Sequence, residues 1–344
     1  MLKNHTRMAE VRAAYPDALL FGCSTAGEIQ GTQVFDGSLT ITAIHFEEGT
    51  RIRGGFVNID SAGDTFKAAT ELAALLQEDD LVHVLVLSDG LNVNGSELVR
   101  GLADRLPKHV SVTGGLAGDG EAFQETLVVW KDIVSPRIIG AVGLFGDRLK
   151  VGCGSLGGWD SFGPERVITR SHENILYELD GKSALDLYKA YLGEHAAGLP
   201  ATGLLFPLSL RSDNHETSVV RTILSVDEEA RSLIFAGDVP EGAYARLMKA
   251  NFDRLIDGAV GAAATCHETL GGQSPDLAIL ISCVGRKMVL KQRIEEEVEG
   301  VADVLGPNAR LTGFYSYGEI SPFTRDAKCD LHNQTMTITT LAER

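Results

Sequence analysis

A glycine-rich phrase recurs three times in this chain of 344 residues, and the recurrence limits the folds that the chain can adopt. The phrase runs glycine, four residues, glycine and an acid, at 22–28, 113–119 and 313–319, with Thr113 in place of the first glycine of the second copy. A proline lies six residues before the first position of every copy. These prolines are Pro16, Pro107 and Pro307. Three occurrences in one context predict a fold built from related modules.

The second and third copies of the phrase lie within the same order of elements. Short apolar runs at Leu81–Leu87 and Leu277–Cys283 are typical of buried strands. Each run precedes an amphipathic segment, 95–106 or 289–305, that predicts a helix. The strands predicted to close these units are Thr126–Trp130 and Thr335–Leu341. Both units therefore share the order strand, helix, proline, strand, glycine turn and strand.

Fewer residues precede the first copy of the phrase than precede the corresponding position in the other two units. We expect a helix at Thr6–Ala14 and a closing strand at Leu39–Phe46, but only fifteen residues precede Pro16. In the other two units the opening strand begins far ahead of the proline. The first unit is therefore expected to lack its opening strand, either because the chain is shorter than its relatives or because its start was trimmed or miscalled.

The modules predict an α/β fold. A strand–helix–strand crossover makes parallel neighbours, and the strand that follows can return antiparallel. We therefore predict mixed β-sheets flanked by helices, built from repeated β-α-β-turn-β modules in two domains, 1–180 and 181–344. The stretch Ala243–Leu270 in the second domain is predicted to be largely helical.

Composition excludes several classes of partner. A net charge of −16 repels the phosphates of nucleic acids, so no nucleic-acid partner is expected. No apolar run is long enough to span a bilayer, and the N-terminus shows no secretory signal, which predicts a cytoplasmic protein without membrane insertion. The five cysteines form no C-x-x-C pair and are expected to be reduced thiols.

The three glycine turns are candidate ligand-contact points. Backbone N–H groups that follow the end of a strand suit a carboxylate or phosphate, and the acids of the phrases would accept from an amine or hydroxyl. Turns of related modules are expected to converge around one cleft. The alternative is that the glycines permit positive φ and the acids cap turn amides. The candidate ligand-binding residues are Cys23, Ser24, Thr25, Glu28, Gly115, Asp119, Tyr315, Tyr317 and Glu319.

Two other functions stay open at this point. Cys23 or Ser24 would be the nucleophile of a hydrolase or transferase, but the sequence identifies no base beside them, so no catalytic residue is predicted. No paired histidine motif for a metal is present. His332, just after the third phrase, would be the ligand if the chain bound haem, and a polar loop residue is its alternative interpretation.

Several segments resemble the signatures of the FIST family. Those similar to its N-terminal domain and linker are Phe21–Ile29, Ser88–Leu91, Gly114–Asp119 and Leu179–Tyr188. Those similar to its C-terminal domain are Gly313–Ile320 and Leu331–Thr335. The resemblance covers nearly the whole chain, in the expected order, and divides it into a FIST N-terminal-like and a FIST C-terminal-like domain.

The resemblance implies a sensory role. FIST domains occur alone or beside kinases, chemotaxis receptors and cyclic-nucleotide enzymes. Members of the family are proposed to bind small molecules such as amino acids, and some bind haem in nitric-oxide sensing. We therefore expect a stand-alone, non-enzymatic sensory domain that binds an amino acid or similar polar metabolite. It would signal through a separate protein such as a histidine kinase or chemoreceptor. Haem is the alternative cofactor, and otherwise none is expected.

Overall fold

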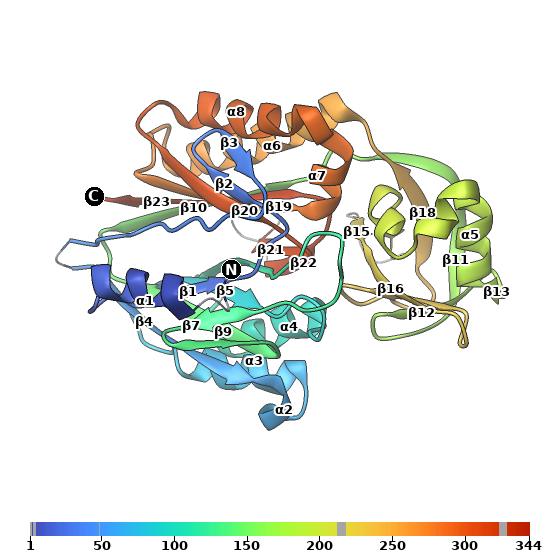
Figure 1. The fold of residues 1–344 in the computed structure, drawn as a ribbon, viewed down its shortest axis with the longest axis horizontal. Helices are drawn as coiled ribbons and strands as arrows, with labels where there is room; N and C mark the ends of the chain where they lie inside the picture. The colour runs from blue at the N-terminus through green and yellow to red at the C-terminus, as the bar shows by residue number, and fades with distance from the viewer. Residues whose placement is uncertain (1, 3–4, 48, 212–217, 323–328) are drawn as a thin grey trace.

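The computed structural model describes residues 2, 5–47, 49–211, 218–322 and 329–344. Figure 1 shows a larger body, made by the chain before Asp160 and after Lys249, and a smaller lobe made by the segment between them. In the body two six-stranded sheets lie face to face, with helices outside both. The predicted mixed sheets with flanking helices are confirmed, because both sheets contain parallel and antiparallel pairs.

The first sheet has the strand order β22-β21-β6-β5-β9-β4. Its strands are β4 (Arg51–Asn58), β5 (Leu81–Ser88), β6 (Ser111–Leu116), β9 (Ile138–Phe145), β21 (Gly318–Pro322) and β22 (Cys329–His332). Two helices, α3 (Thr65–Ala74) and α4 (Gly95–Arg105), cover its outer face after the short α2 (Ile59–Ala62). Asn94 begins α4 because its side chain accepts from two first-turn N–H groups. The crossover through α4 makes β5 and β6 parallel.

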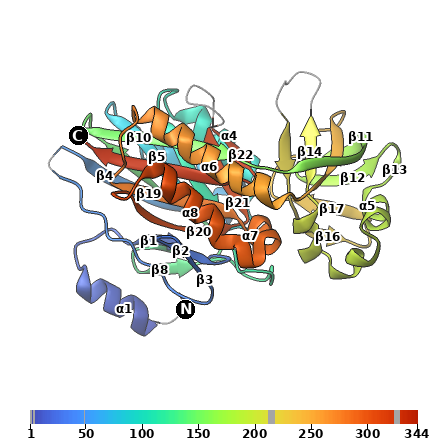
Figure 2. The ribbon, with the colours of Figure 1, turned by 90° about the horizontal axis from the view of Figure 1, so that it is seen from above.

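The second sheet has the strand order β10-β23-β19-β20-β2-β3. Its strands are β2 (Glu28–Gln30), β3 (Gln33–Phe35), β10 (Leu149–Leu156), β19 (Leu277–Cys283), β20 (Arg310–Ser316) and β23 (Met336–Glu343). The helix predicted at 289–305 is interrupted, since α7 (Val284–Leu290) ends before α8 (Ile294–Leu305) begins. Figure 2 shows α8 beside α6 (Phe252–Thr269) across this sheet.

A third, small sheet contains β1 (Phe21–Cys23), β7 (Val128–Trp130) and β8 (Ile133–Ser135). The helix α1 (His5–Ala14) lies at the edge of the body (Figure 2). The prediction of a strand at Leu39–Phe46 was wrong, because this segment is extended but pairs with none of the described strands. A strand needs a neighbour that pairs with its backbone groups, and among the described residues β20 hydrogen-bonds to this segment only through the side chains of Thr42 and Thr312.

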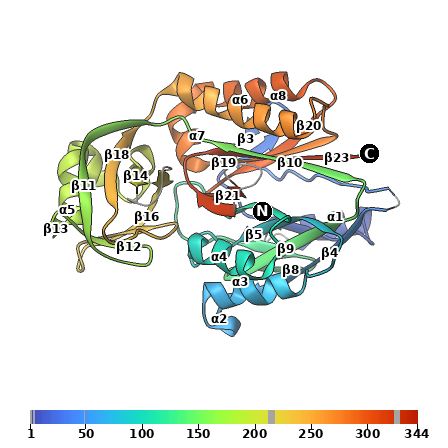
Figure 3. The same cartoon turned by 180° about the vertical axis from the view of Figure 1, so that it is seen from behind.

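The lobe forms one curved sheet, seen from behind in Figure 3. Its strands are β11 (Asp160–His172), β12 (Ile175–Leu179), β13 (Lys182–Ser183), β14 (Leu208–Arg211), β15 (Val219–Arg221), β16 (Ile223–Asp227), β17 (Ser232–Phe235) and β18 (Tyr244–Lys249). A core of its own packs this sheet against α5 (Ala184–Leu192). The predicted domain boundary at 180/181 falls in the turn between β12 and β13.

The helical prediction for Ala243–Leu270 was wrong in its first part. Residues 244–249 form β18, which pairs with β11 and β14. Buried Ala245 and Leu247 alternate with exposed Arg246, the period of a strand with one covered face. The helix begins only at Phe252, after the side chain of Asn251 caps its first turn.

Candidate functional site

The three glycine turns meet inside the body, joined by backbone hydrogen bonds. The N–H of Ala26 donates to Tyr315 O at 2.8 Å, and that of Gly118 donates to Ser24 O at 3.0 Å. The N–H of Tyr317 donates to Leu116 O at 3.1 Å. Each turn therefore contacts the other two, although their side chains do not all face one space.

Glycine is required in the second and third phrases by close packing of strands. A Cβ added to Gly313 would lie 1.8 Å from the carbonyl oxygen of Leu280 on β19. A Cβ added to Gly114 would lie 1.8 Å from that of Val86 on β5. At Gly22 of the first phrase an added Cβ meets no described atom within 4 Å. The first position of the phrase is thus packed against a central strand at Gly313, whereas the second phrase has Thr113 there and makes the close approach at the next residue, Gly114.

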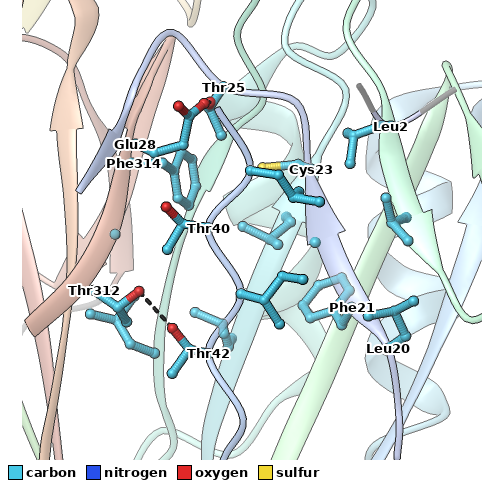
Figure 4. A pocket seen from close by; sticks show the side chains of 18 of the residues that line it. Leu2, Leu20, Phe21, Cys23, Thr25, Glu28, Thr40, Thr42, Thr312 and Phe314 are labelled. Carbon is cyan, nitrogen blue, oxygen red and sulfur yellow. Dashed lines mark hydrogen bonds between the residues drawn. The ribbon is translucent and has the colours of Figure 1, made fainter. Parts of the chain in front are cut away.

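A cavity of about 270 Å³ opens beside the first turn (Figure 4). One wall is the end of β1, and the opposite wall is the extended segment that carries Thr40 and Thr42. Its apolar floor comes from the inner faces of the two large sheets. The floor residues are Leu85, Leu87, Ile279 and Ile281. Cys23, Thr25 and Glu28 line the end nearest the turn.

Glu28 is the acidic residue at the end of the cavity nearest the first turn. Its carboxylate accepts from the Thr25 hydroxyl at 2.5 Å and from the N–H of Ser38 at 3.2 Å, and the Ser38 hydroxyl donates to it as well. A second hollow of about 370 Å³ shares Cys23, Thr25 and Glu28 with the cavity. This hollow adds the polar residues Ser24, Ser38 and Glu125. The first turn therefore lines two neighbouring spaces.

Cys23 and Ser24 are not arranged as nucleophiles. Burial raises the pKa of the Cys23 thiol to about 12, which keeps it protonated near neutral pH. The Ser24 hydroxyl accepts from the N–H of Leu127 at 2.9 Å. Among the described residues no histidine or carboxylate hydrogen-bonds either side chain. The geometry gives no support to the alternative of a hydrolase or transferase.

The candidate residues of the second turn lie away from both hollows. The Asp119 carboxylate accepts from the N–H groups of Phe123, Gln124 and Glu125, so it organises the loop that follows. The Tyr317 hydroxyl also donates to Asp119. A Cβ added to the buried Gly115 would lie 2.9 Å from a methyl group of Ile281. These contacts are those of a turn that packs between sheets.

The candidate residues of the third turn are fully enclosed. The Tyr315 hydroxyl donates to Glu297 at 2.8 Å. Burial raises the pKa of Glu319 to about 8, although Ser316 and Thr335 donate to its carboxylate. Tyr315, Tyr317 and Glu319 line neither hollow. Four of the nine candidates, Cys23, Ser24, Thr25 and Glu28, therefore lie at one open site.

His332 is the last residue of β22, pairs with Glu319 of β21 and is buried. Its Nε2 lies 2.9 Å from the carbonyl oxygen of Ser321, and burial lowers the pKa of the imidazole to about 4. A haem iron would have to replace this hydrogen bond to bind Nε2. Haem binding through His332 stays a prediction. Within the described ranges, no group of three or more His, Cys, Asp or Glu side chains is placed to hold a metal ion.

The sequence reasoning missed the wall opposite β1. Thr40 and Thr42 line the cavity, and the Thr42 hydroxyl donates to that of Thr312 on β20 at 2.7 Å. Ser38 contributes at the polar end. The available signal is the alternation of hydroxyl and apolar residues over 38–42, which the sequence analysis explains only as part of the closing strand at Leu39–Phe46.

No helix in the described part of the chain is long and apolar enough to cross a membrane. The uncharacterized protein MJ1623 of Methanocaldococcus jannaschii is 23% identical over 309 residues, 81% of this chain and 57% of the relative. This chain thus spans less than two thirds of that relative's length. The match to a solved cyanuric acid hydrolase from A. caulinodans covers 86% of this chain and 99% of the hydrolase chain at 10% identity, with a TM-score of only 0.21.

The family assignment rests on two sequence models that divide the chain between them. The model of the FIST N domain matches residues 3–182, and that of the FIST C domain matches residues 184–322. Their division lies next to the boundary predicted at 180/181. Because the two matches together cover most of the chain, this protein belongs to the FIST family of sensory domains.

Proposed function

We propose that this sensory domain binds a small polar metabolite, such as an amino acid, at the hollow between the first glycine turn and the segment from Ser38 to Thr40. The observation that carries the proposal is the placement of Glu28. Its carboxylate is held by Thr25 and Ser38, and Glu28 lines both neighbouring hollows. A fixed carboxylate in a partly enclosed site is suited to a ligand's ammonium group.

The remaining surfaces of the site suit the rest of such a ligand. Leu39 and Leu127 give the hollow an apolar side, and the neutral thiol of Cys23 adds a small, weakly polar surface. Glu125 lines the same hollow and adds a second carboxylate to its wall. A cationic or zwitterionic molecule with a short aliphatic body fits this combination better than a phosphate does.

Signalling would follow from a shift between conformations of the cavity wall. The segment 39–46 pairs with none of the described strands and is joined to β20 through Thr42 and Thr312. A ligand between Glu28 and Thr40 would favour the conformations in which this wall is ordered. A separate protein, such as a histidine kinase or chemoreceptor, would then bind the ordered form. The partner and its contact surface belong to this proposal.

A ligand screen tests the proposal. Amino acids and their amines are screened by thermal shift, and hits are measured by isothermal titration with the wild-type chain and with Glu28→Gln. Loss of a charge-assisted hydrogen bond is expected to weaken binding by about tenfold or more. Glu71→Gln on the exposed side of α3 is the matched control and should leave the affinity unchanged. A panel without any saturable ligand, or equal losses in both variants, would overturn the proposal.

A further inference from the structure

A hollow of about 840 Å³ lies at the end of the body opposite the glycine turns. Val82, Ser111 and Leu149 line it, and they lie where β5, β6 and β10 begin. The second glycine turn lies toward the other end of β6. The hollow shares no lining residue with the one proposed to hold the polar metabolite. The two spaces are therefore separate.

The lining of this hollow is basic, unlike the chain as a whole. Among the described residues that line it, none is an aspartate or a glutamate. Its basic side chains are Lys108, His109, Lys150 and Arg344. The whole chain has 47 acidic residues against 31 lysines and arginines. The hollow is therefore a place on an acidic protein where an anion meets a locally positive field.

Two of these cations have no carboxylate partner in the described structure. Lys108, in the loop between α4 and β6, forms no hydrogen bond or ion pair there. The Nζ of Lys150 on β10 donates to the backbone oxygen of Asp147 at 2.9 Å, which leaves its charge uncompensated. Arg344 differs, because it pairs with Asp276 at 3.1 Å. One uncompensated ammonium group therefore comes from each large sheet or the loop that leads into it.

A buried polar chain ends at this hollow. The Thr339 hydroxyl donates to that of Thr113 at 2.6 Å, and Thr113 Oγ1 lies 3.0 Å from Nε2 of His83. The Nδ1 of His83 lies 2.7 Å from the hydroxyl oxygen of Ser111, which lines the hollow. Burial lowers the pKa of the His83 imidazole to about 3, so the ring is neutral and carries one N–H group.

The direction of this chain leaves the hydrogen of the Ser111 hydroxyl free for a ligand. The ring of His83 also donates to the backbone carbonyl of Ser111, which can only accept, so the ring proton lies on the Ser111 side. The Ser111 hydroxyl oxygen then accepts from the ring. Cys153 lies beside it, but burial raises the pKa of this thiol to about 12. A neutral thiol is a weak acceptor, so a charged oxygen is the better partner for the hydroxyl.

We propose that the hollow between β10 and the starts of β5 and β6 binds a small organic dianion, with Lys108 and Lys150 meeting its two charges and the Ser111 hydroxyl donating to one of its oxygens. Dicarboxylates and phosphomonoesters share this chemistry. Apolar side chains of the lining would contact the body of such a molecule. They are Val82, Leu149, Val151, Leu270 and Pro322.

The dianion would connect two parts of the body that belong to different sheets. β10 is an edge strand that pairs with β23, whereas β5 and β6 belong to the first large sheet. A ligand held by Lys108 and Lys150 would bridge the sheets at the end away from the glycine turns. This inference does not depend on the metabolite proposed to bind at Glu28.

Isothermal titration of the full chain tests the proposal with two probes, succinate as a dicarboxylate and glycerol 2-phosphate as a phosphomonoester. Both carry two charges at slightly alkaline pH. Saturable binding of at least one probe is expected, and acetate should bind about tenfold more weakly or less at the same ionic strength. The stronger of the two probes identifies the class of oxyanion. Absence of saturable binding for both probes, or equal affinity for acetate, would overturn the proposal.

Variants of the chain locate the binding site. Lys108→Gln with Lys150→Gln should weaken binding of the dianion by about tenfold or more. Lys182→Gln with Lys249→Gln, at exposed positions of the lobe, changes the net charge equally and should bind as the wild type does. Equal losses in the two double variants would show a general effect of charge and would sink the assignment of this hollow.

Two single variants complete the test. Ser111→Ala keeps both lysines but removes the donor, so the affinity for the dianion should fall by about fivefold or more. An unchanged affinity would contradict the role given to the hydroxyl. Glu28→Gln should leave dianion binding intact, which separates this result from failure of the metabolite proposal.

Discussion

At the scale of single residues, two buried acidic side chains differ in whether burial or hydrogen-bond donors decide the direction of their pKa shift. Burial acts to raise the pKa of Asp89, but the N–H groups of Leu91 and Arg137 and the hydroxyl of Thr126 outweigh it, so the pKa falls. Glu319 has donors too, yet burial prevails and its pKa rises to about 8. The first acid is a fixed charge in a turn, and the second is protonated at neutral pH.

The raised pKa of Glu319 predicts a particular dependence of stability on pH. The ordinary pKa is 4.5, so between this value and about 8 the folded state holds a proton that the unfolded state has lost. The contribution of Glu319 is therefore fully present below pH 4.5 and is lost as the pH rises through 8. The slope is about 1.4 kcal/mol per pH unit where the difference is one proton.

Glu319→Gln removes this titration while its amide keeps an oxygen for Thr335 and offers N–H to the Ser316 hydroxyl. Urea unfolding between pH 5.5 and 8 measures the free energy of unfolding, and the variant should lose less of it than the wild type as the pH rises. The exposed Glu71→Gln should follow the wild type. Parallel pH profiles for wild type and Glu319→Gln would contradict the assignment.

At the scale of elements, the interrupted helix behind β19 is fixed by one buried ion pair. Arg286 on α7 donates to Glu297 on α8 at 2.7 Å, and both side chains are fully buried. The guanidinium also donates to the carbonyls of Gly157 and Leu255, and the Tyr315 hydroxyl donates to Glu297. The pair therefore joins α7, α8, α6 and the third glycine turn.

Arg286→Met is expected to lower the free energy of unfolding by about 3–5 kcal/mol, because Glu297 is left buried without its cation. The double variant Arg286→Met with Glu297→Leu should recover a large part of that loss, since no unpaired charge remains. Denaturant unfolding of both variants measures the difference. A double variant no more stable than Arg286→Met would show that the hydrogen bonds, not the charge, hold these helices.

The elements that sequence reasoning identified correctly carry their own local pattern. The apolar run of β5 and the stripe of α8 needed no knowledge of neighbours. Segment 39–46 has the pattern of a strand but lacks a partner in the described structure, so its conformation depends on tertiary context. The site divides in the same way. The phrase indicated Cys23, Thr25 and Glu28, whereas Ser38 joins them only through the fold.

At the scale of the whole molecule, the exchange of strands between sheets could not be predicted from spacing. The strand after the first glycine turn, β2, pairs with β20 from the C-terminal part of the chain. The strand after the third turn, β21, pairs with β6 from the N-terminal part. Local patterns specify that a strand exists but not which edge it joins. Each large sheet therefore contains strands from both the N-terminal and the C-terminal part of the sequence. We expect the body to unfold as one unit for this reason.

The lobe is joined to the body through a compact polar junction. Arg221 at the end of β15 is 4% exposed and donates to the carbonyl of Leu331 at 3.0 Å and to that of Asp238 at 3.1 Å. Ser96 on α4 accepts from the N–H of Asp238 at 3.0 Å. The amide of Gln334 donates to the lobe carbonyl of Leu204 at 2.8 Å. A conformational change in the body would reach the lobe through these bonds.

Arg221→Met tests this coupling, because it keeps the length of the side chain but leaves the Leu331 carbonyl without its buried donor. The free energy of unfolding should fall by about 1–3 kcal/mol, and the destabilisation should be confined to the junction between the lobe and the body. Hydrogen exchange should therefore accelerate in β16 and β22 while β5 and β19 keep their protection. Arg246→Met on the exposed face of β18 is the matched control and should leave both regions unchanged. Uniform acceleration in all four strands would mean that the lobe and the body unfold together and that the junction is not a separate link.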